Sequence, residues 1–316
     1  MGKYIIKRLG MTVIVCLLAI ILLSLMPYIV PGDPIKTILG PRASEALVVQ
    51  LRSEMDLDKS PVVQVTNFLG KVAHGDLGKN FITGKPISFQ INEVLPHTIL
   101  LAFTSLLLAV LIGIPLGVLS AIHPGSWIDN LVGALSVSMI TLPPYVAGLL
   151  LLLLFAVTLG WFPAVGTGEW NEPGSLLQHL VLPAFALSIS WIGYLARLVR
   201  ASILEILTTD YIRTARAFGL RDRLIYYKYA LKNAIIPTIA VLGVGLGNLL
   251  GGSIFIEVIF SRQGLGQLIY NSIIDRNYPV VRAGILYAAL MFALANLVAD
   301  ISYRFVNPKI NIEGES

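Results

Sequence analysis

The chain has 316 residues, of which 56% are hydrophobic and 13% charged, and its mean hydropathy is +0.79. A soluble domain carries about 25% charged residues, so this composition excludes an ordinary soluble protein and predicts an integral membrane protein. The single cysteine, Cys16, excludes an internal disulfide and a cysteine-rich metal site. Membrane topology accounts for the net charge of +5, and no nucleic-acid partner is expected.

Six apolar stretches are long enough to cross a membrane. A helix needs about 20 apolar residues to span a hydrocarbon core of about 30 Å, and in lipid a helix satisfies its own backbone polar groups. The predicted spans are residues 8–30, 97–121, 131–159, 180–199, 235–258 and 281–304. The pattern therefore predicts an all-α membrane protein with six transmembrane helices.

Basic residues divide the connections between two sides of the membrane. The loop 160–179 has no Lys or Arg. Basic residues instead gather near the N-terminus and after the fourth span: Lys3, Lys7, Arg8, Arg197, Arg200, Arg213, Arg216, Arg221, Arg223, Lys228 and Lys232. Both termini are therefore expected in the cytoplasm. The first span, 8–30, follows a short basic segment that could belong to a signal peptide. We expect residues 1–30 to form an uncleaved anchor instead, because no small-residue cleavage site follows the span.

The loop 31–96 is too long to be a bare connector, which predicts a small external subdomain. Ser60 and Pro61 are typical of a helix start, and apolar residues then recur at helical spacing until Gly75. Two interpretations stay open: a lid that packs on the spans of its own chain, or a docking surface for an external partner.

The cytoplasmic connection 201–234 predicts two short helices joined by a glycine turn. Thr208 or Thr209 can cap a helix over residues 211–218 that Gly219 ends. Asp222 can cap a second helix that runs toward Asn233 and stops near Pro237. The pattern fits either a basic membrane-surface helix or a docking element for a cytoplasmic protein, which the small Ala215 and Ala217 would allow to approach closely.

Two features inside the spans invite a structural or a functional interpretation. The Thr141-Leu-Pro143-Pro144 sequence interrupts the third span, so Ser138, Thr141, Pro143 and Pro144 are candidates for the translocation path, unless the break serves packing alone. Three glycines spaced four apart, Gly243, Gly247 and Gly251, predict a small-residue face for close helix packing rather than a dinucleotide site. Glu257, at the outer end of the fifth span, receives no substrate role.

The segment Asp210-Tyr-Ile-Arg-Thr-Ala-Arg-Ala-Phe-Gly-Leu220, followed by Lys232-Asn-Ala-Ile-Ile-Pro237, resembles the EAA loop of ABC-importer permeases, in the form of the dipeptide, oligopeptide and nickel branch. Two residues depart from the pattern: Arg213 stands where the general motif begins with Glu, and Phe218 where this branch commonly has Lys. Further matches occur in order along nearly the whole chain: Pro31-Gly-Asp-Pro34, Gly75-Asp-Leu-Gly78, Gly113-Ile-Pro-Leu-Gly117, Glu257-Val-Ile-Phe-Ser261, Gly264-Leu-Gly266, Tyr278-Pro-Val280 and Asn307-Pro-Lys-Ile310.

The resemblance implies the type I ABC importer permease fold in a bacterial cytoplasmic (inner) membrane. It divides the chain into an N-terminal helix (1–30), the external subdomain (31–96), a five-helix transmembrane domain (97–305) and a cytoplasmic tail (306–316). Implied partners are a second homologous permease, two cytoplasmic ATPase subunits or domains, an extracytoplasmic substrate-binding protein and membrane lipid. By analogy, the ATPase-coupling residues would be Arg213, Ala215, Arg216, Gly219 and Leu220.

The sequence contains no G-x-x-x-x-G-K-[ST] motif, so no catalytic residue, metal ligand or cofactor is predicted in this chain, and ATP and Mg²⁺ are expected on the partner ATPase. A di- or oligopeptide is the expected substrate, and nickel or a metal chelate is the alternative within the same branch. Two other classes are weighed: an ion-coupled secondary transporter, and a membrane enzyme built on Gly251-Gly252-Ser253-Ile254.

Overall fold

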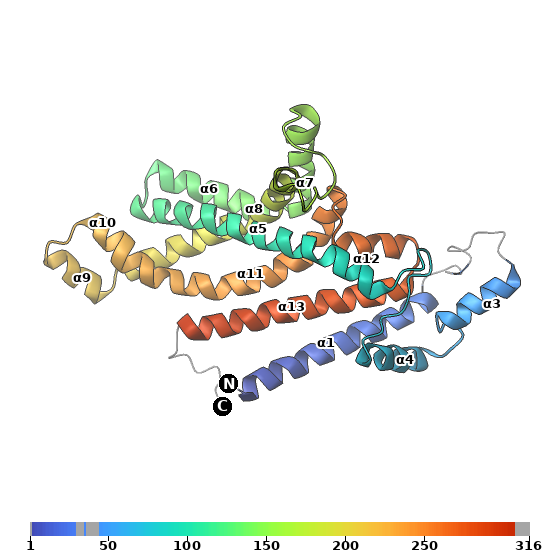
Figure 1. Cartoon of the computed structure of the whole chain (residues 1–316). Coiled ribbons are helices and arrows are strands. Elements are labelled where there is room, and N and C mark those ends of the chain that lie inside the picture. Colours follow the sequence, from blue (N-terminus) through green and yellow to red (C-terminus); the bar gives the residue numbers. More distant parts are fainter. Residues whose placement is uncertain (1, 30–34, 36–43, 307–316) are drawn as a thin grey trace.

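The computed structural model describes residues 2–29, 35 and 44–306, so the predicted tail after Val306 and the motif at residues 31–34 lie outside the described part. Within that part the chain is a helical bundle with an isolated antiparallel bridge between Lys79 and Pro86 (Figure 1). The elements in chain order are α1 (Gly2–Ile29), α3 (Glu45–Glu54), α4 (Pro61–Ala73), α5 (Ile87–Ile122), α6 (Trp127–Thr141), α7 (Pro144–Leu151), the π-helical η1 (Leu152–Thr158), α8 (Pro173–Ile206), α9 (Asp210–Ala217), α10 (Asp222–Leu224), the π-helical η2 (Ile225–Ala230), α11 (Leu231–Ile259), α12 (Leu265–Ile274) and α13 (Tyr278–Val306).

Four of the described helices, α5, α8, α11 and α13, are long and apolar enough to cross a membrane unbroken. The third predicted span, 131–159, is instead divided: Trp127–Thr141 and Pro144–Thr158 meet at an angle of 102°. Pro143 and Pro144 cause the break, because neither has an N–H to continue the helical hydrogen bonds. The first predicted span lies in α1, whose shorter apolar part is Gly10–Leu25.

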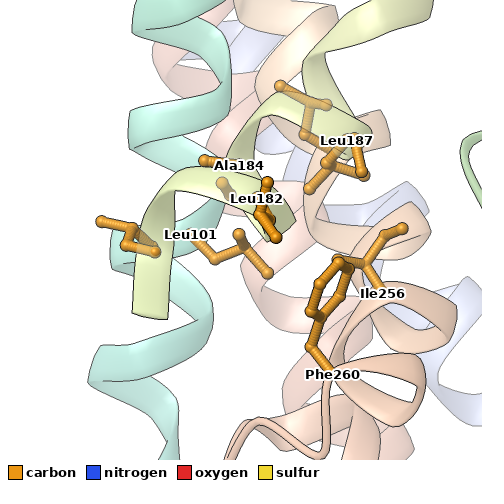
Figure 2. Close-up of a cluster of buried hydrophobic side chains, with 10 residues drawn as sticks. Leu101, Leu182, Ala184, Leu187, Ile256 and Phe260 are labelled. Atoms are coloured by element: carbon orange, nitrogen blue, oxygen red, sulfur yellow. The ribbon is translucent and has the colours of Figure 1, made fainter. Parts of the chain in front are cut away.

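Helix α8 forms the centre of the bundle, since 67% of its apolar stretch is buried against 28% for α5. It packs against α5, α6, α7 and α11. Close approach to α5 depends on Gly113 and Gly117, where a Cβ atom would lie 2.8 Å from the Ile192 carbonyl oxygen and 2.6 Å from that of Ala196. Figure 2 shows the core where three helices meet: Leu101 of α5 and Ile256 of α11 lie beside the α8 residues Leu182, Ala184 and Leu187.

The glycine face of α11 packs against α13, but over a shorter length than the spacing predicts. A Cβ at Gly243 would overlap Ala299, and one at Gly247 would lie 3.2 Å from the Phe292 ring. No atom lies within 4 Å of the corresponding position at Gly251, so this third glycine is outside the close contact.

Two helix boundaries differ from the sequence-based expectation. Helix α5 begins at Ile87, ten residues before the predicted span, and its added turns bury Ile87 and Ile91 against α12 and α13. The helix that begins at Asp222 does not stop near Pro237 but runs through η2 and α11 to Ile259, with Arg221 rather than Asp222 at its N-cap. Proline is tolerated inside membrane helices where neighbouring groups satisfy the freed carbonyl.

The described part of the 31–96 segment packs on the spans of its own chain. Helix α4 begins with Pro61 at its first position, as expected, and its Phe68 is buried with Cys16 and Ile20 of α1 and Leu286 of α13. In Figure 1, α3 and α4 lie at the opposite end of the bundle from α9 and α10. The N-terminal end of α1 and the C-terminal end of α13 both point toward the α9 end.

Candidate functional site

The most distinctive surface element is α9, a two-turn helix that projects from the end of the bundle (Figure 1). Thr209 stands at its N-cap, and Gly219 ends it with φ +74°, a left-handed conformation that side-chain-bearing residues rarely adopt. The inner face of α9 packs on η2, where the fully buried Ile212 of α9 lies in one apolar cluster with the fully buried Ile225 of η2. Asn233 on α11 also donates a hydrogen bond to the Tyr211 hydroxyl at 2.9 Å. The element is therefore fixed to the start of α11.

The predicted coupling residues divide between the two faces of α9. Arg213 and Arg216 are exposed, and among the described residues each forms an ion pair with an exposed carboxylate, Asp210 at 3.4 Å and Asp222 at 3.9 Å. Exposed ion pairs of this kind contribute little, so both guanidinium groups remain accessible to a partner. Ala215 is buried in the inner face, so its small side chain allows α9 to pack on its own chain.

An aromatic side chain dominates the tip of this element. Phe218 is 82% exposed, although a phenyl ring of this kind is normally covered. Behind it, Gly219 and Leu220 line an open groove of about 700 Å³ together with Arg221, Arg223, Leu224 and Tyr227. An exposed apolar residue rimmed by arginines is typical of a protein-binding surface. We name this surface, formed by Arg213, Arg216, Phe218, Gly219 and Leu220, the α9 tip.

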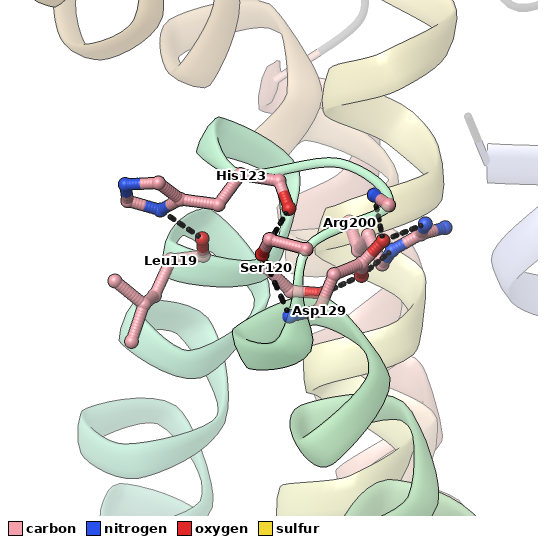
Figure 3. Close-up of polar contacts among 7 residues, drawn as sticks. Leu119, Ser120, His123, Asp129 and Arg200 are labelled. Atoms are coloured by element: carbon pink, nitrogen blue, oxygen red, sulfur yellow. Dashed lines mark hydrogen bonds and ion pairs between the residues drawn. The ribbon is translucent and has the colours of Figure 1, made fainter.

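A partly buried ionic network lies at the same end of the bundle as the α9 tip. The Asp129 carboxylate on α6 accepts two hydrogen bonds from Arg200 on α8, at 2.6 and 2.7 Å, and one from the Gly125 amide at 2.9 Å (Figure 3). The Ser120 hydroxyl on α5 donates another. A bidentate arginine–carboxylate pair fixes orientation as well as distance, so this network sets the relative positions of three spans.

The residues proposed for the translocation path lie at the break between α6 and α7. Ser138, Thr141 and Pro143 are exposed, and Pro144 is half-buried at the start of α7. Both hydroxyl groups donate to carbonyl oxygens of their own helix, Ser138 to Ala134 and Thr141 to Val137. Their exposure leaves them available to line a path, while their hydrogen bonds satisfy carbonyls near the break.

Sequence reasoning missed Asp129–Arg200 and the exposure of Phe218. By its sequence context Arg200 is one of the positive-inside charges, and nothing local pairs it with a residue 71 positions away. A signal for Asp129 did exist: a carboxylate at the start of an apolar span needs a partner.

Comparisons with known proteins agree with this architecture. Residues 113–312 match the family model for the binding-protein-dependent transport system inner membrane component, and residues 1–102 match that of its N-terminal region. The glutathione transport system permease proteins GsiC of Salmonella typhimurium and Escherichia coli K12 are each 36% identical over 310 residues, which is 98% of this chain and 99% of theirs.

Solved structures show the same fold at low sequence identity. An inward-facing form of the MetNI methionine ABC transporter is similar to 71% of this chain with a TM-score of 0.59 and 23% identity, covering 99% of that chain. An amino acid ABC transporter solved with histidines is similar to 75% of this chain with a TM-score of 0.54 and 18% identity, covering 98% of that chain.

The fold and the family matches thus define a membrane permease subunit of an ABC importer. The chain belongs to the binding-protein-dependent transport system inner membrane component family, in the branch of the peptide and nickel importers. Such a permease works with an ATPase and a substrate-binding protein. The family is one of transport-system permeases, which sets aside a membrane enzyme and an ion-coupled transporter.

Proposed function

We propose that this permease imports small peptides and that the α9 tip receives the motion of a cytoplasmic ATPase. The peptide assignment is supported by the GsiC relatives, whose names specify transport of glutathione, a tripeptide. A second homologous permease completes the path, and two ATPase subunits or domains bind and hydrolyse ATP with Mg²⁺. Both termini and α9 face the cytoplasm, and the α3–α4 segment faces the binding protein.

The observation that carries the coupling role is the combination of a buried inner face and a solvent-exposed outer face on α9. Ile212 and Ala215 anchor the helix to the segment leading into α11, so a push on α9 moves a membrane span. On the outer face, Phe218 can enter an apolar groove of the partner while Arg213 and Arg216 meet its acidic groups.

Uptake by the reconstituted complex tests the substrate. Liposomes contain the permease, its paired permease and the ATPase, with ATP inside. Labelled glutathione, a dipeptide and Ni²⁺ are offered outside, together with the binding protein. ATP-dependent accumulation of a peptide and not of Ni²⁺ is expected. Accumulation of Ni²⁺ alone would contradict the peptide assignment, and uptake without ATP would contradict the importer mechanism.

Gly219 offers a sharp test of the coupling role. No atom lies within 4 Å of where its Cβ would be, so substitutions there differ only in how well they tolerate φ +74°. Gly219→Val should lower ATP-dependent uptake at least tenfold, because a left-handed residue costs about 1–2 kcal/mol even without β-branching. Gly219→Asn should keep most of the activity, because Asn adopts this conformation more readily. Equal uptake by Val and wild type, with equal membrane levels, would refute the role.

A further inference from the structure

A second polar cluster lies at the opposite end of the bundle from α9, around the start of α12 (Figure 1). Helix α12 begins after Gly264, a residue without a side chain to cap the first turn. The first amide groups of a helix have no partner within the helix and need acceptors from elsewhere. In this protein two other helices supply them.

Each of the first three N–H groups of α12 donates to a side chain of another helix. The Leu265 amide donates to the Thr98 hydroxyl on α5 at 2.8 Å. The Gly266 and Gln267 amides donate to the same carboxylate oxygen of Glu257 on α11, at 2.7 and 3.2 Å. The Thr98 hydroxyl in turn donates to the other Glu257 oxygen at 2.7 Å. We call this set, Thr98 and Glu257 with the first turn of α12, the clasp.

The surrounding sequence is shaped to hold the Glu257 carboxylate. A Cβ at Gly264 would overlap the carboxylate, and a Cβ at Gly266 would lie 2.9 Å from its Oε2 atom and 2.6 Å from the Ile254 Cα. Glu257 is fully buried, and Thr98 is 3% exposed. A buried ionised carboxylate is costly unless hydrogen bonds or opposite charges compensate it. The helix amides supply the hydrogen bonds here, and the two glycines leave the space that the carboxylate occupies.

Arg262 supplies the opposite charge. Its side chain is fully buried, and its Nε and Nη2 atoms have no hydrogen-bond partner among the described residues. Burial lowers the pKa of Arg262 to about 10, while the charge of Glu257 acts in the opposite direction, so the guanidinium stays charged at neutral pH. Removing the carboxylate would therefore leave a buried cation uncompensated.

The clasp stands at the end of a helical segment that begins at the α9 tip. The chain is helical without interruption from Asp222 through η2 and α11 to Ile259, so Glu257 lies near the far end of the segment to which α9 is anchored. Beyond the clasp, Leu265 and Ile269 of α12 pack with Val280 and Ala283 of α13. The turn after α12 is tied to the 78–86 hairpin, where Asn277 donates to Asn80 at 2.7 Å.

We propose that Glu257 and Thr98 are positioning residues that make α12 move with α11 and α5, so that motion received at the α9 tip reaches the surface formed by α12 and the 78–86 hairpin. The contact is polar and directional, whereas the neighbouring packing of α12 against α13 is apolar and non-directional. The inference goes beyond the peptide assignment and rests on the proposed role of α9 only for its transport measurement.

Thr98 provides the main test through a matched pair of variants. Thr98→Val keeps the shape and removes the hydroxyl, while Thr98→Ser keeps the hydroxyl. Hydrogen–deuterium exchange of α12 is followed in the full complex in nanodiscs, and uptake and ATP hydrolysis are measured in liposomes. In Thr98→Val we expect amide exchange in the first turn of α12 to accelerate about tenfold or more. The number of ATP molecules hydrolysed per peptide imported should rise several-fold, and Thr98→Ser should resemble the wild type in both.

Glu257 and Arg262 provide a second, independent test. Glu257→Gln removes the charge and keeps one acceptor oxygen for the Gly266 and Gln267 amides, but its NH2 group cannot accept from the Thr98 hydroxyl. It should therefore accelerate α12 exchange and uncouple hydrolysis from import, and adding Arg262→Met should restore part of both. Glu93→Gln, which removes an exposed carboxylate from α5, is the control and should change neither.

Two results would overturn the proposal. Unchanged α12 exchange in both Thr98→Val and Glu257→Gln would mean that the clasp does not hold the helix. Faster exchange with an unchanged ratio of hydrolysis to import would mean that the clasp is structural only. If the wild-type complex does not import peptide, the substrate assignment fails instead, and the ratio is then measured with whichever substrate is imported.

Discussion

Asp129 shows how much one buried carboxylate can determine in a membrane bundle. It is 6% exposed and joins α5, α6 and α8 through Ser120, Gly125 and Arg200. Because the network closes at the end that carries the α9 tip, it keeps the spans nearest to the proposed ATPase contact in a fixed arrangement.

Replacing Asp129 by Asn should destabilise the protein by about 1–3 kcal/mol, since it removes the charge that strengthens the bidentate contact with the 36% exposed side chain of Arg200. The thermal midpoint in detergent, followed by fluorescence-detected gel filtration, measures the effect. Asp275→Asn, which changes an exposed carboxylate, should leave the midpoint within about 1 °C because substitutions away from such features have small effects. Equal midpoints for the two variants would contradict the structural role of the network.

Asp56, between α3 and α4, predicts a pH effect. Partial burial would raise its pKa, but hydrogen bonds from Lys59 and Asn67 and the charge of Lys71 hold the pKa of Asp56 below its ordinary value of 3.8. The stabilisation is therefore present above pH 3.8 and is lost as the pH falls through the lower native pKa. Limited proteolysis of the α3–α4 segment with pepsin should accelerate in that range. In Asp56→Asn the segment should already be more sensitive at pH 5, unlike in Asp58→Asn.

At the scale of elements, two glycines of α11 predict opposite outcomes for the same substitution. A Cβ at Gly243 would overlap Ala299 of α13, whereas a Cβ at Gly251 meets open space. Gly243→Ala should destabilise the bundle by about 1–3 kcal/mol through overpacking. Gly251→Ala should be neutral or stabilising, because Ala favours a helix over Gly. Thermal midpoints of the two variants in one detergent measure the difference, and a lower midpoint for Gly251→Ala would contradict the packing described.

At the scale of the whole molecule, the separation of the two ends predicts opposite labelling from the two sides of the membrane. Val62 on α4 is 72% exposed and Phe218 is 82% exposed, and Cys16, the natural cysteine, is buried. In a Cys16→Ser background, Val62→Cys should react with an impermeant maleimide in intact spheroplasts. Phe218→Cys, expressed without the ATPase that is proposed to cover this residue, should react only after permeabilisation. The reverse pattern would invert the proposed orientation.

The sequence by itself determined the membrane class, the helical fold, the family and the α9 helix with its glycine end. Each of these depends on residues close together in the chain. The length of the apolar stretches predicts the membrane helices, Pro143 and Pro144 predict the break in the third one, and the capping residues and the EAA-like motif define α9. The helix boundaries at Ile87 and Pro237 were not predictable, because a helix continues past a charge or a proline when its neighbours satisfy it.

Only the tertiary structure decided which polar residues act together. Arg200 is 71 residues from Asp129, and Thr98 is 159 residues from Glu257, and no periodicity connects such positions. Gly251 has the same spacing as Gly243 and Gly247 but lacks a close neighbour, because α13 approaches only part of the helix. The burial of a polar side chain and its hydrogen bonds to other helices are properties of the packed bundle, because these contacts form only when the helices have assembled.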